Sequence, residues 1–350
     1  MLSKVSLTCI IKTKNNHMSN IPACFFPTKV LFVDDEVNFL KSLKIELTWS
    51  LLTCELFDNP NEALCYFNEE YESDPFTNRW VQAPDAEHFE HRSVDVNIQG
   101  LHQEIYNPQR FNQISTIVVD YNMPGIDGLA FCEQISDPHV QKILLTGEAD
   151  EHIAVDAFNK GLIHHYLRKQ DRNLAKLLKE AIAKAQQRYF LSLSQIVNES
   201  ISSNVSEPSA LNDPVFFEFF SKQLKQNNVA EYYLFESIGS FLFLDPEGNS
   251  KSLFLKNRDQ MEAVYFELKD EEELSQDFKD AVKRFKKIFC YQMWGKAPFP
   301  EPSEWKEYFQ VAFQLKGQQD YFYAFTSGMP EIDRERFLSF VDYKKQVVLA

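Results

Sequence analysis

The stretch Val30-Leu31-Phe32-Val33-Asp34-Asp35-Glu36 decides the fold of this chain. Its four consecutive apolar residues are followed directly by acidic residues. An apolar run of this length is typical of a strand buried on both faces, as in a parallel sheet. Ligand sites of open α/β sheets lie at the carboxyl ends of such strands. The stretch therefore predicts a parallel strand that ends at a polar site.

Three later segments repeat this pattern of an apolar run that ends in polar groups. They are Ile117–Asp120 with the turn 121–128, Ile143–Gly147 and Tyr166–Lys169. The carboxyl ends of parallel strands meet at one edge of a sheet. We therefore expect three carboxylates, a hydroxyl and an ammonium group to converge there, from Asp34, Asp35, Asp120, Thr146 and Lys169.

Clustered carboxylates repel one another, so such a site is stable with a cation between them. Mg²⁺ prefers oxygen ligands in octahedral geometry and keeps several waters. We predict Asp35 and Asp120 as direct ligands, with Asp34 acting through water. The backbone carbonyl of Asn122 is the candidate for a third protein oxygen.

The same groups fit phosphoryl transfer to an aspartate. An aspartate carboxylate can act as a nucleophile and form an acyl phosphate, and Asp120 is the candidate. The ammonium of Lys169 is a point charge suited to phosphoryl oxygens. The hydroxyl of Thr146 is placed to hydrogen-bond them.

Residues 29 to about 190 resemble the receiver domain of two-component response regulators, which has the CheY-like fold. The acidic pair, Asp120 with the turn Met123–Gly128, Thr146-Gly147 and Lys169 carry the resemblance. It implies that Asp120 is phosphorylated, with a sensor histidine kinase or phosphotransfer protein as donor. It also implies that Thr146 and Tyr166 move together as the switch. Asn122 and Glu148 lie where this family tunes hydrolysis, and a phosphoryl group lasting minutes is expected.

The sequence departs from the family pattern in two places. The family usually has Lys-Pro with a cis proline after the fifth strand, whereas this chain has Lys169-Gln170. Asp35 and Asp120 are 85 positions apart, while the intervening elements typically need about 50. The surplus, residues 73–112, is predicted to be a surface insertion or lid. His88 and His91 within it are the weaker alternative of a metal-binding pair.

Composition limits the class of protein. The 350 residues are 44% hydrophobic and predict two domains. The six cysteines form no close pair, which favours a reducing cytoplasm over a disulfide framework or zinc site. No apolar run reaches 18 residues, so no membrane span is expected. The net charge of −15 disfavours broad binding to nucleic acid or anionic lipid, although a local basic patch remains an alternative.

The expected architecture is a doubly wound α/β receiver with a five-stranded parallel sheet, a long helix, and an α+β output domain with an antiparallel sheet. The expected boundaries are an N-terminal extension at 1–28, a receiver at 29–170, a helix with linker at 171–205 and the output domain at 206–350. The extension is either a loose arm, with Met18 as a candidate start, or an ordered arm. The long helix is either interdomain or part of a dimer interface.

In the output domain we predict helices at 214–225, 258–268, 271–293 and 333–347. Strands are predicted at 230–236, 240–244, 251–256, 309–315 and 321–325. This half contains 18 Lys plus Arg against 24 Asp plus Glu, and it shows no phosphate loop, nucleophile elbow or helix-turn-helix. Its basic stripe at 279–287 is predicted to be a solvated helix face.

Three functions remain open for the output domain. It binds a partner or a second protomer on phosphorylation, it is an enzyme or nucleotide-binding module, or it binds DNA as a transcriptional regulator. Acidic groups on strand ends, Glu231, Glu236 and Asp245, motivate the second. The layout loosely resembles atypical quorum-sensing response regulators, which implies cell-density signalling and phosphorylation-linked dimerisation.

Overall fold

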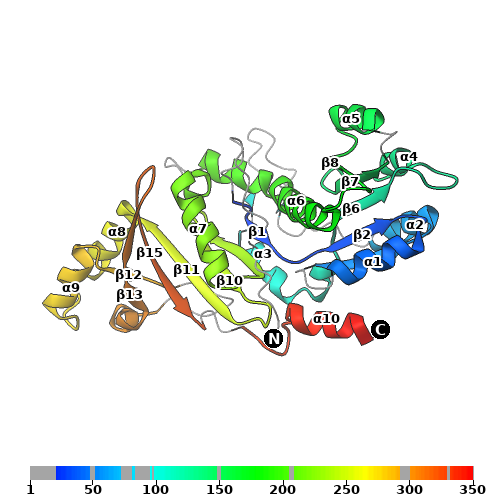
Figure 1. Cartoon of the computed structure of the whole chain (residues 1–350). Coiled ribbons are helices and arrows are strands. Elements are labelled where there is room, and N and C mark those ends of the chain that lie inside the picture. The colour runs from blue at the N-terminus through cyan, green and yellow to red at the C-terminus, as the bar shows by residue number, and fades with distance from the viewer. Residues whose placement is uncertain are drawn as a thin grey trace, which may run out of the picture.

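The computed structural model describes residues 21–47, 52–71, 81–82, 95–96, 98–147, 151–204, 209–291, 300–328 and 332–349. Two main sheets lie side by side, one parallel and one antiparallel (Figure 1). The predicted fold class, an α/β receiver followed by an α+β unit, is confirmed.

The parallel sheet has five strands in the order β3-β2-β6-β7-β8. Its strands are β2 (Lys29–Val33), β3 (Thr53–Phe57), β6 (Ile114–Asp120), β7 (Gln141–Thr146) and β8 (His165–Arg168). The central strands β2, β6 and β7 are buried along their whole length, as their apolar runs predict.

Helices cover both faces of the parallel sheet. They are α1 (Val37–Leu47), α2 (Pro60–Tyr71), α4 (Gly128–Glu133), α5 (Glu151–Asn159) and α6 (Leu174–Asn204). Side chains of α1 and α6 share a buried cluster with Val30 and Phe32, while those of α2, α4 and α5 share another with Leu31 and Val33. The alternation along β2 shows that this strand is covered on both faces.

The antiparallel sheet has six strands in the order β1-β9-β10-β11-β15-β14. They are β1 (Cys24–Phe25), β9 (Glu231–Glu236), β10 (Ser240–Leu244), β11 (Ser250–Asn257), β14 (Phe313–Lys316) and β15 (Asp320–Ser327). The other elements of this half are η6 (Ala210–Asn212), α7 (Pro214–Gln226), α8 (Arg258–Leu268), α9 (Gln276–Lys283), β12 (Lys287–Phe289), η7 (Pro302–Tyr308), β13 (Phe309–Val311) and α10 (Phe340–Leu349).

Of the described residues in the predicted helix at 271–293, only Gln276–Lys283 form a helix, α9. Helix α9 ends at Lys283, and Phe285 follows it with a left-handed φ of 56°. The next residues form β12, which pairs antiparallel with β13. The charged residues around 283–287 obscured the pattern of a short strand. Its Phe289 is buried in a small apolar cluster with Phe278 and Trp305, and its Ile288 is buried in the main core.

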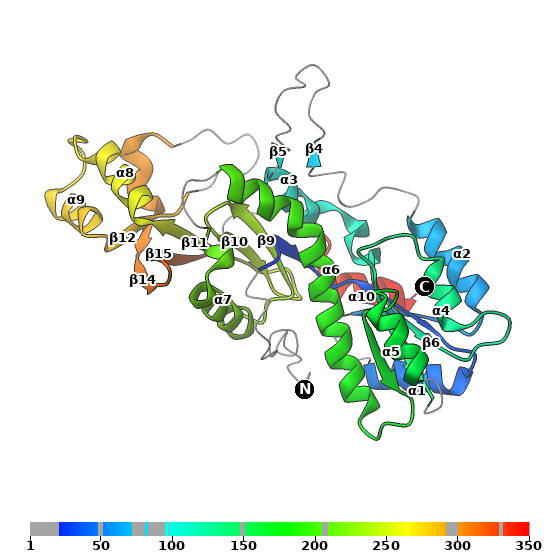
Figure 2. The same ribbon diagram turned by 90° about the horizontal axis from the view of Figure 1, so that it is seen from above.

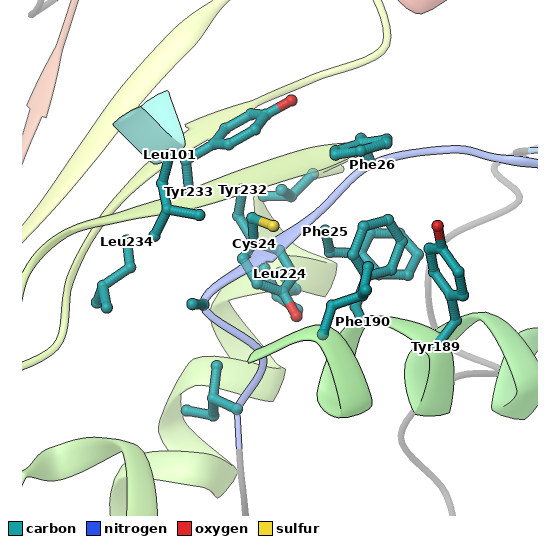
Figure 3. Close-up of a cluster of buried hydrophobic side chains, with 14 of the residues drawn as sticks. Cys24, Phe25, Phe26, Leu101, Tyr189, Phe190, Leu224, Tyr232, Tyr233 and Leu234 are labelled. Atoms are coloured by element: carbon teal, nitrogen blue, oxygen red, sulfur yellow. The ribbon is translucent and has the colours of Figure 1, made fainter. Parts of the chain in front are cut away.

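The segment before the receiver is an ordered arm where it is described. Residues 24–25 pair with β9 at the edge of the antiparallel sheet. Figure 3 shows Phe25 and Phe26 beside Phe190 of α6, with Tyr232 and Tyr233 of β9 nearby. The ring centroids of Phe26 and Phe190 are 4.8 Å apart. The arm therefore joins the first strand of the receiver to the second sheet.

The predicted surface insertion at 73–112 is wrong for its last part. Residues 98–112 form α3 (Ile98–Gln103) and two 3-10 turns, η3 (Glu104–Tyr106) and η4 (Pro108–Asn112). Leu101, Ile105 and Phe111 are fully buried. These turns fill the space between the two sheets, so they belong to the core. The described fragments β4 (Val81–Gln82) and β5 (Asp95–Val96) pair with each other; His88 and His91 lie outside the described residues.

Helix α6 extends over both halves of the molecule (Figures 1 and 2). Its first part buries Leu178 and Ile182 against the parallel sheet, and its later part buries Tyr189 and Phe190 against the arm. This arrangement supports the interdomain alternative for the long helix. Helix α10 also returns to this side, where the Tyr343 hydroxyl donates to Asn112 Oδ1 at 2.6 Å. In the described part of the chain, no helix is long and apolar enough to cross a membrane.

Candidate functional site

The predicted site residues meet at the carboxyl edge of the parallel sheet. Asp34 follows β2, Asp120 ends β6, Thr146 ends β7 and Lys169 follows β8. Backbone hydrogen bonds hold these strand ends in register: Tyr121 N donates to Leu145 O at 2.9 Å and Lys169 N to Thr146 O at 3.0 Å. The register therefore places an acid, a hydroxyl and an amine next to one another.

Three carboxylates form a compact acidic cluster. Oxygen atoms of Asp34, Asp35 and Asp120 all lie within 4.8 Å of one another. Asp34 and Asp120 are buried, whereas Asp35 is exposed. Hard oxygen ligands at this spacing fit a divalent cation such as Mg²⁺, with water completing the shell. Asn122 lies in the loop after β6, two residues beyond Asp120, and its side chain is exposed.

The ammonium of Lys169 bridges the buried carboxylates. Its Nζ lies 2.8 Å from Asp34 Oδ2 and 3.0 Å from Asp120 Oδ2, with Glu36 Oε1 at 3.5 Å. The amine itself is largely buried, with 15% of its side chain exposed. Its position provides positive charge beside Asp120, where a phosphoryl group would add negative charge.

Burial raises the pKa of Asp120 to about 6, against the opposing effect of Lys169. Burial also raises the pKa of Asp34, again opposed by Lys169. Both shifts have the cause expected for carboxylates withdrawn from water with too little positive charge around them. At pH 7 Asp120 is still mainly ionised, so its carboxylate is available as a nucleophile.

The hydroxyl of Thr146 is buried without a partner. Thr146 is fully buried, and its Oγ1 makes no hydrogen bond within the described structure. A buried hydroxyl without a partner is energetically costly. A phosphoryl oxygen on Asp120 would be an acceptor for it. Tyr166 of β8 is half-buried and packs against the same apolar cluster as Phe131 and Ala154.

Local geometry around Asp120 explains the glycine of the following turn. A Cβ atom added to Gly128 would lie 2.3 Å from the carbonyl oxygen of Asp120. Asp127 starts helix α4 by accepting hydrogen bonds from Leu129 N and Ala130 N, at 2.9 and 2.8 Å. The turn therefore passes close to Asp120 only because residue 128 has no side chain.

The structure brings together Asp34, Asp35, Asp120, Thr146 and Lys169. Glu148 lies outside the described residues. Sequence reasoning missed Phe39, whose ring centroid is 5.0 Å from Lys169 Nζ. Phe39 lies on the first turn of α1, and no pattern in the sequence signals its contact with Lys169.

The three acidic residues that suggested an enzymatic output domain each interact with another residue of the chain. Glu231 pairs with Arg110 at 2.9 Å and Glu236 with Lys256 at 2.7 Å. Asp245 accepts hydrogen bonds from Asn249 within its hairpin turn. These carboxylates are therefore occupied in the folded chain and do not form a shared cluster.

Comparison with known proteins agrees with this geometry. A family model for the response regulator receiver domain matches residues 87–181. The match begins within the long segment between β3 and β6. It therefore leaves out the acidic pair Asp34 and Asp35, which follows β2. Comparison with curated protein sequences gives no match.

Solved structures extend the similarity over nearly the whole chain. The Legionella pneumophila response regulator LqsR is 33% identical, with 95% of this chain and 97% of LqsR covered and a TM-score of 0.78. A receiver domain protein from Clostridium thermocellum is 21% identical over 46% of this chain and 97% of its own, with a TM-score of 0.31. The response regulator TrrA from Thermotoga maritima, solved in complex with Mg²⁺-BeF, is 21% identical over 45% of this chain and 98% of its own, with a TM-score of 0.30.

Both halves of the chain share the fold of LqsR, and receiver domains generally bind Mg²⁺ and take their signal from a histidine kinase or phosphotransfer protein. The resemblance drawn from the acidic pair, Asp120, Thr146 and Lys169 is thereby confirmed at the level of the family. This chain belongs to the two-component response regulators.

Proposed function

We propose that Asp120 is the phosphoryl acceptor of this response regulator. The observation that carries the proposal is the convergence of three carboxylates, one ammonium group and one buried hydroxyl without a partner at a single sheet edge. These are the kinds of group that phosphoryl transfer to an aspartate needs. We place the receiver at 29–170, the connecting helix at 171–205 and the output domain at 206–350, with 1–28 as the extension.

In the reaction, an Asp120 carboxylate oxygen attacks the phosphorus of a phosphohistidine on the donor. A P–O bond forms, the P–N bond breaks, and the imidazole of the donor leaves and takes up a proton. Lys169 compensates the negative charge on the transferred group, and Thr146 donates its hydroxyl proton to a phosphoryl oxygen. Asp34, Asp35, Asp120 and the carbonyl of Asn122 would hold Mg²⁺, which supplies further charge compensation.

We infer that the switch is read out through Thr146 and Tyr166. Thr146 ends β7, and Tyr166 lies on the neighbouring strand β8, half-buried against the main apolar cluster. A movement of the Thr146 hydroxyl towards a phosphoryl group would therefore change the surroundings of the Tyr166 ring. Such a change acts as a population shift between two packings. Helix α5 exposes Val155 and Phe158, three residues apart on one side of the helix, each about two-fifths to one-half accessible. We propose this apolar pair as part of the surface that a second protomer covers after phosphorylation.

We further propose a role in quorum sensing, supported by the similarity to LqsR along both halves of the chain. The output domain then acts by binding a partner or a second protomer in the cytoplasm, and nucleic-acid binding is the less favoured alternative. Hydrolysis of the acyl phosphate would be tuned by Asn122 and Glu148.

The direct test is intact-mass spectrometry after incubation with acetyl phosphate and Mg²⁺. We expect one phosphoryl group on the wild-type chain, lost in Asp120→Asn and strongly reduced when Mg²⁺ is removed. Light scattering with beryllofluoride and Mg²⁺ then reports dimer formation, which Phe158→Ser should weaken without affecting phosphorylation. Phosphorylation of the Asp120→Asn protein at the wild-type rate would contradict the assignment.

A further inference from the structure

We propose that Phe39 is a positioning residue that holds the Lys169 ammonium beside Asp120. This inference rests on the proposed phosphoryl transfer and adds a residue to it. The Lys169 Nζ lies 5.0 Å from the centroid of the Phe39 ring, within the range of a cation–π contact. It lies 3.0 Å from Asp120 Oδ2. The ammonium is thus held between the acceptor carboxylate and an aromatic ring.

Helix α1 fixes the position of this ring. Phe39 stands on the first turn of α1, directly after the acidic pair. It is half-buried and packs against the cluster that contains Leu40 and Leu43 of the same helix and Leu178 of α6. The ring is therefore anchored by the core, whereas the four-carbon stem of a lysine is flexible.

Phe39 differs from the other contacts of Lys169 in how it responds to the reaction. Asp34 and Asp120 are the carboxylates that a bound cation attracts, and Asp120 also becomes esterified. Glu36 is exposed and 3.5 Å away, so water screens its attraction. The ring carries no net charge, binds no metal and forms no bond during the reaction. Among the described contacts, it is the one that can stay unchanged while the carboxylates exchange partners.

The consequence is that Lys169 remains in place for the incoming phosphoryl oxygens. Without the ring, binding of a cation by Asp34 and Asp120 would leave the ammonium free to rotate into water. The cost would then appear mainly in the phosphorylation rate, because the lysine would have to be ordered again before the group is transferred.

The test compares three variants of the full chain. Phe39→Leu keeps an apolar side chain but removes the ring, Phe39→Tyr keeps the ring, and Leu43→Ala disturbs the same helix without contacting Lys169. With a small phosphoryl donor and saturating Mg²⁺, we expect Phe39→Leu to be phosphorylated about three- to tenfold more slowly, the range of a partly buried cation–π contact. Phe39→Tyr should recover the rate to within about twofold of wild type.

Leu43→Ala separates positioning from stability. We expect it to lower the melting temperature more than Phe39→Leu does, yet to keep the wild-type phosphorylation rate. If the rate instead follows the melting temperature across all three variants, the ring has only a structural role and the proposal fails.

Proton–carbon NMR of ¹³C-labelled lysine gives a readout that does not depend on phosphorylation. A ring current should shift the ε-protons of Lys169 upfield in wild type and Phe39→Tyr, and this shift should vanish in Phe39→Leu. Phosphorylation of wild type without such a shift would overturn the role of Phe39 and leave the acceptor assignment standing. A wild-type chain that shows the shift but never accepts a phosphoryl group would overturn the proposed function, and the positioning role with it.

Discussion

At the scale of single residues, the site contains more negative than positive charge. Two buried carboxylates share one ammonium group, and burial raises the pKa of both. The acidic cluster is therefore less stable in its charged form than the same groups would be in water. A bound cation, or the neutralisation of one acid, should relieve this imbalance.

We predict that Asp120→Asn makes the metal-free protein more stable at pH 7.5, by about 1–3 kcal/mol. The pKa of Asp120 rises from 3.8 to about 6 on folding. The folded chain therefore holds the Asp120 proton more tightly than the unfolded chain does. The stability that this protonated carboxyl contributes is fully present below pH 3.8 and is lost as the pH rises through about 6. Urea unfolding at pH 5 and pH 7.5 measures the difference, which should be larger at pH 7.5.

The exposed carboxylate Asp58 provides the control for this substitution. Asp58→Asn should leave the free energy of unfolding unchanged at both pH values, because that side chain lies in solvent. Equal stabilisation by Asp120→Asn at pH 5 and pH 7.5 would show that burial does not raise the pKa of the Asp120 carboxyl in the folded chain.

A second residue makes stability depend on pH in the opposite direction. His164 Nδ1 accepts a hydrogen bond from the backbone N–H of Lys142 at 3.0 Å, which requires a neutral ring nitrogen. Burial lowers the pKa of His164, and the positive charges of Lys142 and Arg188 add to this effect. Its contribution to stability is therefore complete above pH 6.5 and is lost as the pH falls through the lowered pKa.

We predict that His164→Ala costs about 1 kcal/mol at pH 7.5, the value of a lost hydrogen bond, and much less at pH 5. His164→Asn keeps an acceptor but cannot be protonated, so its stability should not fall through this histidine on acidification. Chemical unfolding of the three proteins at both pH values checks the prediction. An acid loss in His164→Asn as large as in wild type would assign the effect to another group.

At the scale of elements, one buried ion pair joins the two sheets. Arg110 of η4 donates from Nε and Nη2 to Glu231 of β9, at 2.9 and 3.1 Å, and both side chains are fully buried. Tyr233 donates its hydroxyl to the same carboxylate at 2.7 Å, and Leu338 O accepts from Arg110 at 2.6 Å. Arg110 therefore ties the segment that leads into β6 to the output sheet and to the residues before α10.

We predict that Arg110→Met destabilises the chain by about 3–5 kcal/mol, because it leaves Glu231 charged and buried without its partner. Removing the charge as well, in Arg110→Met with Glu231→Gln, should restore part of that loss. A double-mutant cycle in urea measures the coupling. If the two single changes and the double change are simply additive, the pair does not act as a joint between the sheets.

The elements also show what sequence patterns encode and what they do not. The apolar run at 30–33 predicted β2 correctly, because a strand buried on both faces needs only apolar residues. Residues 98–112 escaped prediction because short 3-10 turns carry no long periodicity. Arg110 in particular suggests a surface position, and only its three-dimensional partners make burial possible.

The candidate site divides in the same way. Asp34, Asp120, Thr146 and Lys169 could be found because parallel strands bring their carboxyl ends together, whatever the length of the intervening chain. The contact of Phe39 with Lys169 could not be derived from those patterns, since it depends on how far α1 tilts over the sheet edge. The pairing of β1 with β9 could not be predicted either, because a strand of only two residues has no recognisable sequence pattern.

At the scale of the whole molecule, the two sheets share one apolar core. The cluster that contains Val33 and Phe131 of the receiver also contains Phe216, Leu242 and Tyr321 of the second half. The arm, residues 98–112, helix α6 and helix α10 all connect the two halves (Figure 1). Packed side chains, rather than a loose tether, therefore connect the receiver to the second sheet.

We predict that the receiver and the output half do not fold independently. A fragment of residues 21–205 keeps the parallel sheet but exposes Phe25, Phe26 and Phe111, and leaves Arg110 buried without its carboxylate. Each phenylalanine taken out of its apolar contacts costs about 1.5–3 kcal/mol, so the three together approach the whole stability of a typical domain. Expressed alone, fragments 21–205 and 206–350 should aggregate or unfold without a cooperative transition, whereas expressed together they should purify as a one-to-one complex.

The matched control is the same pair of fragments carrying Arg110→Met, which should assemble more weakly. Two soluble fragments, each with its own cooperative unfolding transition and no affinity for the other, would show that the shared core is not needed for folding, and signalling from Asp120 would then have to pass through helix α6 alone.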